Sequence, residues 1–392
     1  MTAAAVLVAA RRSAIGTAGR AFAEHTVDAL AAPVLAHVAR AVAPAGLAVD
    51  DVVLGNCMGP GGDLARVSAL RAGLGDGVPG VTVDRQCGSG LDAVLQSASR
   101  VRAGDARLLL AGGAESASTA PHRSWPGSGE RYTRAPFAPT GFPDPDMGPA
   151  ADRLAAELGI SRARQDAWAA RSHTRAAAAQ QAGVFDAEIV PVDGVVRDDR
   201  PRAAMDVARL ARFAPVFAGD HDAQLAAGSR AVAASDRGTV TAGNSCGFSD
   251  GAAAMAVTTE AVARELGLPA LRVRAAAVAA GDPSLPGLGA APAARAALAR
   301  AGMSPADLGF VEITEAFAAQ VLAVSDALGL DEDLISGDGG AIALGHPWGA
   351  SGAVLLVRLA ARMAAADDSR AGLAACSIGG GQGVAMIVER VA

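Results

Sequence analysis

The two ends of this 392-residue chain repeat the same order of predicted elements. Near the start, a helix-like run at 27–42 leads through Ala-Gly-Leu to a strand at 52–54. Near the end, a helix-like run at 293–300 leads through Ala-Gly-Met to a strand at 310–313. Each half continues with a helix that begins in small residues, CGSGLDAVL or GASGAVLLV, and then a glycine-rich strand. The alternation of strands and helices in a matching order predicts two copies of one α/β unit.

The middle of the chain fits neither copy. It opens on a Pro/Gly-rich stretch and continues with a helical run that Ser161 is expected to N-cap and Gly183 to end. An insertion of this kind is typical of a lid or substrate domain, or of a segment that only covers the surface. We predict an N-terminal half of residues 1–115 and 237–262, an inserted loop domain of residues 116–236, and a C-terminal half of residues 263–392.

Composition limits how the core is built and what the chain binds. Hydrophobic residues make up 51% and aromatic residues only 3%, so the core must consist mainly of Ala, Val and Leu. The 47 glycines allow close packing of helices on sheets. The formal charge of −6 argues against general binding to nucleic acid or to an anionic membrane.

The distribution of apolar residues and cysteines indicates in which cellular compartment the protein works. Glycine, proline or charge interrupts each apolar run before it approaches the length of a membrane span. A predicted strand at the start precedes two arginines, which is the reverse of the order in a signal peptide. Four scattered cysteines lack metal-ligand spacing: Cys57, Cys87, Cys246 and Cys376. The sequence therefore predicts a soluble, cytoplasmic protein with free thiols and no metal site.

Cys87 is the first candidate for chemistry. In VTVDRQCGSGLDAVLQSA, a strand breaks at Asp84 and a helix follows, so Cys87 is expected at a helix N-terminus. The unpaired N–H groups and the helix dipole there favour a thiolate. Free cysteines are also common as small buried core residues, and this segment alone leaves both roles open.

His346 is the second candidate. In GGAIALGHPWGASGA it lies between glycine and Pro347, which keeps His346 out of a helix that can restart at Gly349. It occupies a place in the second copy close to that of Cys87 in the first. If a pseudo-twofold axis relates the copies, both helix N-termini point into one site, with a nucleophile and a base. A single histidine is more often structural, so that alternative stays open.

Several segments together resemble the thiolase family, in the order in which the family has them: CGSGLDAV, GGAESAS, TAGNSCGFSDGAAA, TEAFAAQ, GGAIALGHPWGASGA and GGGQGVAM. The resemblance implies a five-layered αβαβα fold of two similar halves with an inserted loop domain. It implies a homodimer or a tetramer built as a dimer of dimers. The implied reaction transfers acyl groups between coenzyme A and a carbon nucleophile. Coenzyme A thioesters are then substrates, and no permanently bound cofactor, nucleic acid or membrane partner is expected.

The resemblance also implies roles for particular residues. Cys87 would attack the ketone of a 3-ketoacyl-CoA and His346 would hold its proton, in thiolysis or, in reverse, in a Claisen condensation. Backbone N–H groups of Cys87 and of the loop at Gly379 and Gly380 suit one oxyanion, and His346 suits the other. The residues that match the family's substrate-binding segments are Cys246, Gly247, Ala316, Phe317, Trp348 and Met147.

The chain departs from the family at the second catalytic cysteine, which thiolases place in Cys-x-Gly-x-Gly. Ser377 stands at that position and Cys376 one residue earlier. Neighbouring side chains on a strand point to opposite faces, so Cys376 can replace the missing thiol only through a bulge or a slip. A serine hydroxyl is also a far weaker acid than a thiol. Thr314 stands where the family has an asparagine that holds a water, and its hydroxyl can still do so.

Three enzyme readings and one binding reading follow. A thiolase-type acyl-CoA C-acyltransferase is the leading prediction. A ketoacyl synthase on the same fold needs a second histidine or an asparagine in the second half, and residues after 260 contain only His346 and no asparagine. The alternative is a degenerate thiolase-like protein that binds acyl-CoA, or a slow thioester hydrolase, without carbon–carbon chemistry.

Overall fold

The computed structural model describes residues 4–217 and 238–391, so part of the predicted inserted domain lies outside the described residues. Ten strands form one sheet in the order β10-β11-β12-β9-β1-β8-β5-β3-β4, with β2 paired to β8. Their bounds are β1 (Ala5–Arg12), β2 (Gly16–Thr17), β3 (Asp51–Gly55), β4 (Gly80–Val83), β5 (Leu108–Ser116), β8 (Ser249–Thr259), β9 (Ala270–Ala280), β10 (Leu308–Ile313), β11 (Ala371–Ile378) and β12 (Gln382–Arg390).

The sheet consists of two half-sheets with the same topology. In the first, β3 pairs parallel with β5, and β5, β8 and β1 follow in antiparallel pairs. In the second, β10 pairs parallel with β11, and β11, β12 and β9 follow in antiparallel pairs. A short antiparallel contact between β1 and β9 joins the two. The internal repeat predicted from the sequence is present.

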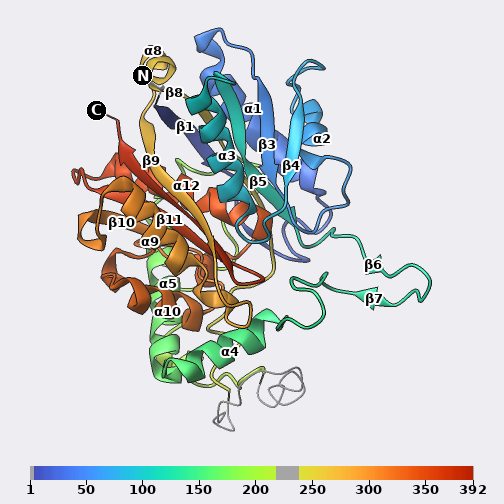
Figure 1. The fold of residues 1–392 in the computed structure, drawn as a ribbon, viewed down its shortest axis with the longest axis vertical. Helices are drawn as coiled ribbons and strands as arrows, with labels where there is room; N and C mark the ends of the chain where they lie inside the picture. Colours follow the sequence, from blue (N-terminus) through green and yellow to red (C-terminus); the bar gives the residue numbers. More distant parts are fainter. Residues whose placement is uncertain (1–3, 218–237, 392) are drawn as a thin grey trace.

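Helices separate and cover the half-sheets. α3 (Ser89–Ala103) and α12 (Trp348–Ala365) pack against each other between them. α1 (Val27–Val42) and α2 (Leu64–Arg71) cover the outer face of the first half-sheet, and α9 (Ala290–Ala301) and α10 (Ala318–Leu328) lie outside the second (Figure 1). Together these form layers in the order α-β-α-β-α, which confirms the expected thiolase-like fold.

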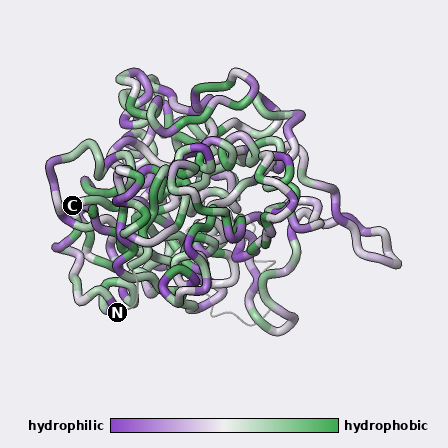
Figure 2. Tube along the Cα trace, turned by 90° about the horizontal axis from the view of Figure 1, so that it is seen from above, coloured by the Kyte–Doolittle hydropathy of each residue, from purple (hydrophilic) through white to green (hydrophobic). Residues whose placement is uncertain are grey.

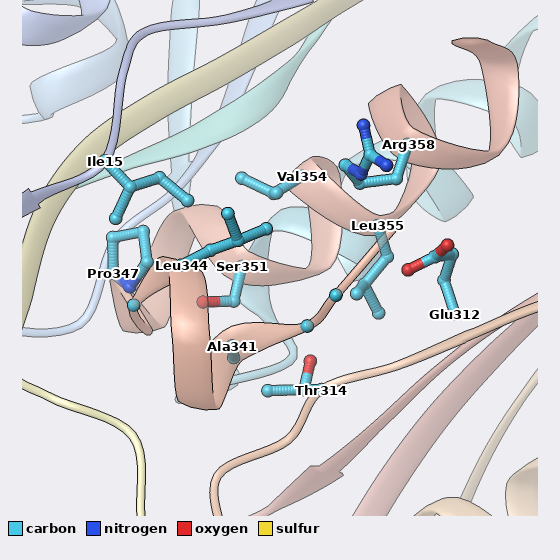
Figure 3. A pocket seen from close by; sticks show the side chains of 13 residues that line it. Ile15, Glu312, Thr314, Ala341, Leu344, Pro347, Ser351, Val354, Leu355 and Arg358 are labelled. Carbon is cyan, nitrogen blue, oxygen red and sulfur yellow. The ribbon is translucent and has the colours of Figure 1, made fainter. Parts of the chain in front are cut away.

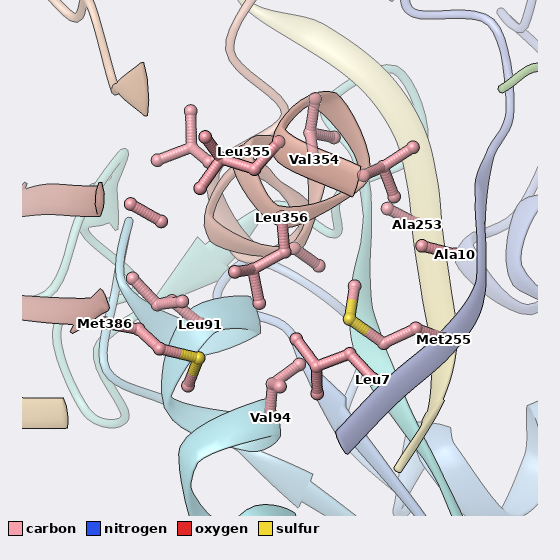
Figure 4. Close-up of a cluster of buried hydrophobic side chains, with 14 of the residues drawn as sticks. Leu7, Ala10, Leu91, Val94, Ala253, Met255, Val354, Leu355, Leu356 and Met386 are labelled. Carbon is pink, nitrogen blue, oxygen red and sulfur yellow. The ribbon is translucent and has the colours of Figure 1, made fainter. Parts of the chain in front are cut away.

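The core on either side of the central helices is aliphatic, as the composition requires. Leu91 and Val94 of α3 and Leu356 of α12 are fully buried, with Met255 of β8 and Met386 of β12 beside them (Figure 4). Hydrophobic segments cross the middle of the molecule, and hydrophilic residues recur along its outer loops (Figure 2). Burial of this apolar surface is the main favourable term in folding.

One apolar helix corrects the prediction that no run approaches the length of a membrane span. Within the described residues, the 19-residue segment Val27–Ala45 is long and apolar enough to cross a membrane. Its inward face, however, is fully buried against the first half-sheet, including Leu30, Val34, Leu35 and Val38 at 0% exposure. The core helix of a folded domain passes the same test of length and composition, so α1 is a core helix here.

The middle region extends from the layered body and also packs beside it. β6 (Arg123–Ser124) and β7 (Arg131–Tyr132) form a hairpin that projects away from the body (Figure 1). α4 (Met147–Glu157) and α5 (Arg162–Gln181) pack against α10, and the short α6 (Val207–Leu210) packs on α5. The Ser161 side chain accepts a hydrogen bond from the Arg164 N–H, which confirms the predicted N-cap. The predicted domain boundaries themselves remain predictions.

Buried ion pairs tie the middle region to both halves. The Glu188 carboxylate accepts hydrogen bonds from Arg12 of β1 at 2.9 Å and from Arg358 of α12. Arg12 also pairs with Asp198, and Arg358 with Asp338. Glu188, Arg12 and Arg358 are each no more than 1% exposed. Removing one partner of such a pair leaves an uncompensated buried charge, which is strongly destabilising.

We therefore expect Glu188→Gln to lower the free energy of unfolding by about 3 kcal/mol, because both guanidinium groups lose a shared buried carboxylate. Denaturant titration of the purified protein measures this. The matched control is Glu389→Gln, whose partner Arg274 is 3.8 Å away in a half-exposed pair, and it should change stability by less than about 0.5 kcal/mol. Equal effects of the two substitutions would contradict the structural role of Glu188.

Candidate active site

A tightly bonded turn presents Cys87 between β4 and α3. The Ser89 hydroxyl donates to the Gln86 carbonyl at 2.6 Å and accepts from the Arg85 N–H at 2.8 Å. Gln86 has a φ of +46°, in the left-handed region that a side chain rarely adopts, and its N–H donates to Asp84 at 2.8 Å. Backbone strain of this kind persists only where the surroundings fix it, and it is frequent at functional sites. The turn holds Cys87 next to the first residues of α3, as predicted.

His346 lies in a loop between α11 (Ala341–Leu344) and α12. Its N–H donates to the Ser249 hydroxyl at 3.1 Å, and its Nδ1 is 2.6 Å from the Ser351 Oγ. Gly345 has a φ of +114°, and a Cβ there would come within 2.4 Å of the Ser249 Oγ, so only glycine fits. Among the described residues, Nε2 of the buried His346 has no hydrogen-bond partner. Nε2 is therefore the ring atom left for chemistry.

The first turns of α3 and α12 touch, as the pseudo-twofold hypothesis expects. A Cβ on Gly90 would lie 2.8 Å from the Gly349 carbonyl oxygen, and one on Gly113 would lie 2.0 Å from the same atom. The buried Glu115 carboxylate accepts from the Gly349 N–H at 3.0 Å and from the Cys57 N–H at 3.1 Å. Glycines thus let the two helix N-termini approach, and the Glu115 carboxylate ties the start of α12 to the loop after β3.

The surroundings of Cys87 disfavour the thiolate that a helix N-terminus favours. Burial raises the pKa of Cys87 well above its ordinary range, and the nearby Cys376 and Cys246 raise it further. A backbone hydrogen bond at Cys87 lowers the pKa, but by less than burial and these two cysteines raise it. Burial also lowers the pKa of His346 to about 4. At neutral pH the pair is therefore a thiol and a neutral imidazole, and the imidazole is in the form that can accept a proton.

The other three cysteines of the chain lie near Cys87, although they are far apart in the sequence. The pKa of Cys57 is raised first by burial, then by Glu115, and then by Cys87, so Cys57 also lies near Cys87. The Cys57 sulfur lies 3.7 Å from the Ser89 Oγ. All four are free thiols.

Cys376 lies on the face of β11 that is turned toward Cys87. The pairing of β11 with β12 runs without a bulge through Cys376↔Val384 and Ile378↔Gln382. Val384 and Ile378, which share the face of Cys376, meet Gly88, where a Cβ would lie 2.4 Å from the Ile378 side chain. On this face the Cys376 sulfur is 3.0 Å from the hydroxyl of Thr314.

Ser377 points to the opposite face of β11, toward η2 (Pro286–Leu288) and α9. Its hydroxyl donates to the Gly287 carbonyl at 2.6 Å and accepts from the Ala290 N–H at 3.1 Å. Gln320 Nε2 is a third neighbour, at 3.4 Å. Since no bulge or slip occurs, the structure does not bring Cys376 into the position that Ser377 holds. The two residues have separate environments.

The remaining predicted residues lie in four places. Cys246 and Gly247 run beside Ala316 and Phe317, with the Cys246 N–H donating to the Ala316 carbonyl at 3.0 Å. Burial raises the pKa of Cys246 to about 12. Met147 is the first residue of α4, in the middle region.

The last two of these places carry aromatic neighbours. The Trp348 ring is tilted against the ring of Phe248, at 5.3 Å between centroids, and Phe248 is 68% exposed. Gly379 lies against Phe137, where a Cβ would be 2.5 Å from the ring. Gly380 has a φ of +78°, which makes the sharp turn between β11 and β12.

Sequence reasoning missed three buried polar residues of this site: Glu115, Ser351 and Gln320. Each lies inside a segment that the sequence analysis singled out, GGAES, GASG or TEAFAAQ. A charged or polar side chain at a position otherwise expected to be buried was the available signal. In the described part of the chain, no group of three or more His, Cys, Asp or Glu side chains could hold a metal ion.

The fold and the site together define a duplicated α/β protein with a cysteine and a histidine at the adjoining N-termini of its two central helices. Residues 5–261 match the thiolase N-terminal domain and residues 268–390 match the thiolase C-terminal domain. The chain belongs to the thiolase family.

Individual relatives match over nearly their whole length. The chain is similar to an acetyl-CoA acetyltransferase of Cupriavidus necator, with 41% identity over 98% of this chain and 99% of the relative. It is 39% identical to an acetyl-CoA acetyltransferase of Escherichia coli, over 98% of this chain and 99% of the relative. The crystal structure of the Bacillus anthracis acetyl-CoA acetyltransferase superimposes with a TM-score of 0.88 at 35% identity, covering 100% of this chain and 99% of that one.

The raised pKa of Cys87 has a direct consequence for its reactivity. In the free protein we expect alkylation of Cys87 by iodoacetamide to rise about tenfold per pH unit between pH 6 and 9, without a plateau, because the thiolate fraction grows throughout that range. A simple thiol, which titrates near ~8.5, should level off at the top of the range. Intact mass and peptide mapping measure the rate, with Cys87→Ala as the control for the other cysteines. Fast, pH-independent alkylation would mean a preformed thiolate.

Proposed function

We propose that this protein is a thiolase-type acyltransferase that moves an acyl group between coenzyme A and a carbon nucleophile through an acyl-Cys87. The observation that carries the proposal is that Cys87 and His346 lie at the N-terminal ends of two helices that pack against each other, with Nε2 of His346 without a partner among the described residues. The relatives are named acetyl-CoA acetyltransferases, so acetyl-CoA and acetoacetyl-CoA are the first substrates to test.

The first step forms the acyl-enzyme. The Cys87 thiol gives its proton to Nε2 of His346 as the sulfur attacks the ketone carbon of a 3-ketoacyl-CoA. Both groups are neutral before attack, so negative charge appears only as the bond forms, on the substrate oxygen. The backbone N–H groups of Cys87 and of the loop at Gly379 and Gly380 are the donors proposed for that oxyanion.

The second step breaks the carbon–carbon bond. The tetrahedral intermediate collapses to acyl-Cys87 and the enolate of acetyl-CoA, and a protein acid protonates the enolate carbon. The thiol of a second coenzyme A gives its proton to the conjugate base of that acid and attacks acyl-Cys87. The Cys87 sulfur leaves with the proton held on Nε2 of His346, and the shortened acyl-CoA is released. Run in reverse, an acetylated Cys87 is attacked by the enolate of acetyl-CoA, which is a Claisen condensation.

We assign the protein acid to Cys376 rather than to Ser377. Cys376 is a thiol, it acts electrostatically on Cys87, and its sulfur contacts the Thr314 hydroxyl. The Ser377 proton is engaged by the Gly287 carbonyl and its oxygen by the Ala290 N–H. Burial raises the pKa of Cys376 to about 12. A thioester enolate is a stronger base than an ordinary thiolate, so it can still take a proton from this thiol. A serine hydroxyl is a far weaker acid and a poorer proton donor.

The assembly and the compartment complete the proposal. We infer a homo-oligomer, a dimer or a dimer of dimers, that works in the cytoplasm on coenzyme A thioesters without a resident cofactor. The fully buried face of α1 and the four free thiols support a folded protein of a reducing compartment. Light scattering of the purified protein distinguishes dimer from tetramer.

Cys87→Ala should abolish the covalent acyl adduct that the unchanged protein forms with acetyl-CoA, because the variant lacks the sulfur that attacks in the proposed first step. Intact mass spectrometry after incubation with acetyl-CoA, and separately with acetoacetyl-CoA plus coenzyme A, detects it. An adduct without carbon–carbon turnover in the unchanged protein would favour the hydrolase alternative. An adduct retained by the variant would remove Cys87 as the nucleophile.

The acid assignment predicts unequal effects at two neighbouring positions. Cys376→Ala should lower kcat for thiolysis of acetoacetyl-CoA roughly 100-fold, within the range for loss of a general acid. Ser377→Ala should cost less than roughly fivefold, because it removes hydrogen bonds to the backbone and no transferred proton. Steady-state kinetics on both variants, alongside thermal melts, measure the difference. The opposite ranking, or a gain of activity in Ser377→Cys, would move the acid to position 377.

A further inference from the structure

A small cavity lies behind His346, on the side away from Nε2. It has a volume of about 20 Å³ and lies between α12, the end of β10 and the loop before His346 (Figure 3). Two hydroxyl side chains line it, Ser351 of α12 and Thr314, together with the charged Glu312 and Arg358. All four are at most 5% exposed. A cavity of this size with several polar partners holds one water molecule.

Both hydroxyls are bonded to groups of the proposed mechanism. The Ser351 Oγ is 2.6 Å from Nδ1 of His346, and the Thr314 Oγ1 is 3.0 Å from the Cys376 sulfur. A hydroxyl can accept one hydrogen bond while it donates another. Ser351 and Thr314 can therefore each face a water in the cavity while keeping these contacts. Within the described residues, Nε of Arg358 is also buried without a hydrogen-bond partner.

We propose that Ser351 is a positioning residue for His346 and that it begins a buried proton path, through one water in this cavity and Thr314, to Cys376. The path rests on the proposed function, since it links the base and the acid named there. It lets the two groups exchange a proton behind the substrate, so that neither depends on bulk solvent between steps.

The proton balance of the path closes within one cycle. His346 Nε2 gains the proton of the Cys87 thiol, and Cys376 loses its proton to the enolate carbon. The Nδ1 proton of His346 then moves to Ser351, the Ser351 proton to the water, a water proton to Thr314, and the Thr314 proton to the Cys376 sulfur. This leaves a neutral acyl-enzyme, with a Cys376 thiol and with His346 protonated on Nε2 alone. When coenzyme A arrives the same hops run in reverse, the Cys376 thiolate takes the coenzyme A proton, and Nε2 returns its proton to the departing Cys87 sulfur, so that every group regains its starting protonation state.

The acid–base properties of His346 make such an outlet useful. Burial lowers the pKa of its imidazolium to about 4. An imidazolium held at neutral pH is therefore unfavourable. An outlet at Nδ1 shortens the time for which His346 carries both protons. The Ser351 contact also fixes the plane of the ring, and with it the direction of Nε2.

The first experiment compares single variants in the full-length protein. Ser351→Ala should lower kcat for thiolysis of acetoacetyl-CoA roughly 10- to 100-fold, within the range for proton-transfer defects, with little change in KM. Ser351→Thr, which keeps the hydroxyl, should restore activity to within about threefold. The matched control is Ser97→Ala, which removes an equally buried hydroxyl from the other central helix, bonded only to the Ala93 carbonyl at 2.8 Å. It should leave kcat unchanged.

A double-variant cycle separates a path from two independent structural effects. If Ser351 and Thr314 act in one path, Ser351→Ala combined with Thr314→Val should be no slower than the slower single variant. Losses that multiply would overturn the path, and full activity of Ser351→Ala would overturn the positioning role as well. If Ser351→Ala does not fold, the comparison is Ser351→Thr against Ser351→Cys, in which only the former should be active.

The readouts also separate this inference from the proposed function. Intact mass of the unchanged protein reports acyl-Cys87 directly. If no adduct and no turnover occur with acetyl-CoA or acetoacetyl-CoA, the proposed function fails. If the unchanged protein is acylated and turns over, but Ser351→Ala is equally fast, only the proton path fails.

Discussion

The close approach of the two central helices is the contact on which the site depends. α3 and α12 meet where Gly90 and Gly113 leave room for the Gly349 carbonyl, and a methyl group at either glycine would clash with it. Because each helix begins at the end of a loop that carries a reactive side chain, this contact brings Cys87 and His346 toward one another. A fold with almost no aromatic residues suits this arrangement, since alanine and glycine allow helices and sheets to pack at short distances.

Burial at this contact then determines the acid–base chemistry. The same desolvation raises the pKa of Cys87 and lowers that of His346, so the resting pair carries no charge between the two half-sheets. A preformed thiolate and imidazolium would need compensation inside a low-dielectric core. The neutral pair avoids that cost and moves a proton only when substrate arrives.

The sequence predicted the architecture well because the repeat is written in periodicity and glycine positions. The matching order of elements gave the two half-sheets, and the strand-to-helix pattern placed Cys87 at the start of α3. The charge state of Cys87 could not be predicted, since it depends on burial in the folded chain and on the electrostatic effect of residues that are distant in sequence, such as Cys376 and Cys246. Ser351 was missed for a related reason: a serine in the first turn of a helix has an ordinary capping role, and only the fold shows that it faces His346.

The register of one strand pair determines what the serine at position 377 means for the site. Because β11 and β12 pair without a bulge, the thiol at Cys376 and the hydroxyl at Ser377 are fixed on opposite faces. The thiol shares its face with Thr314 and with the packing against Gly88, whereas the hydroxyl bonds to η2 and α9. This chain has serine where the family has its second catalytic cysteine, but it keeps a thiol one residue earlier, at Cys376, on the face of β11 that is turned toward Cys87. The threonine beside that thiol supplies the hydrogen bond through which Cys376 can connect to the rest of the site.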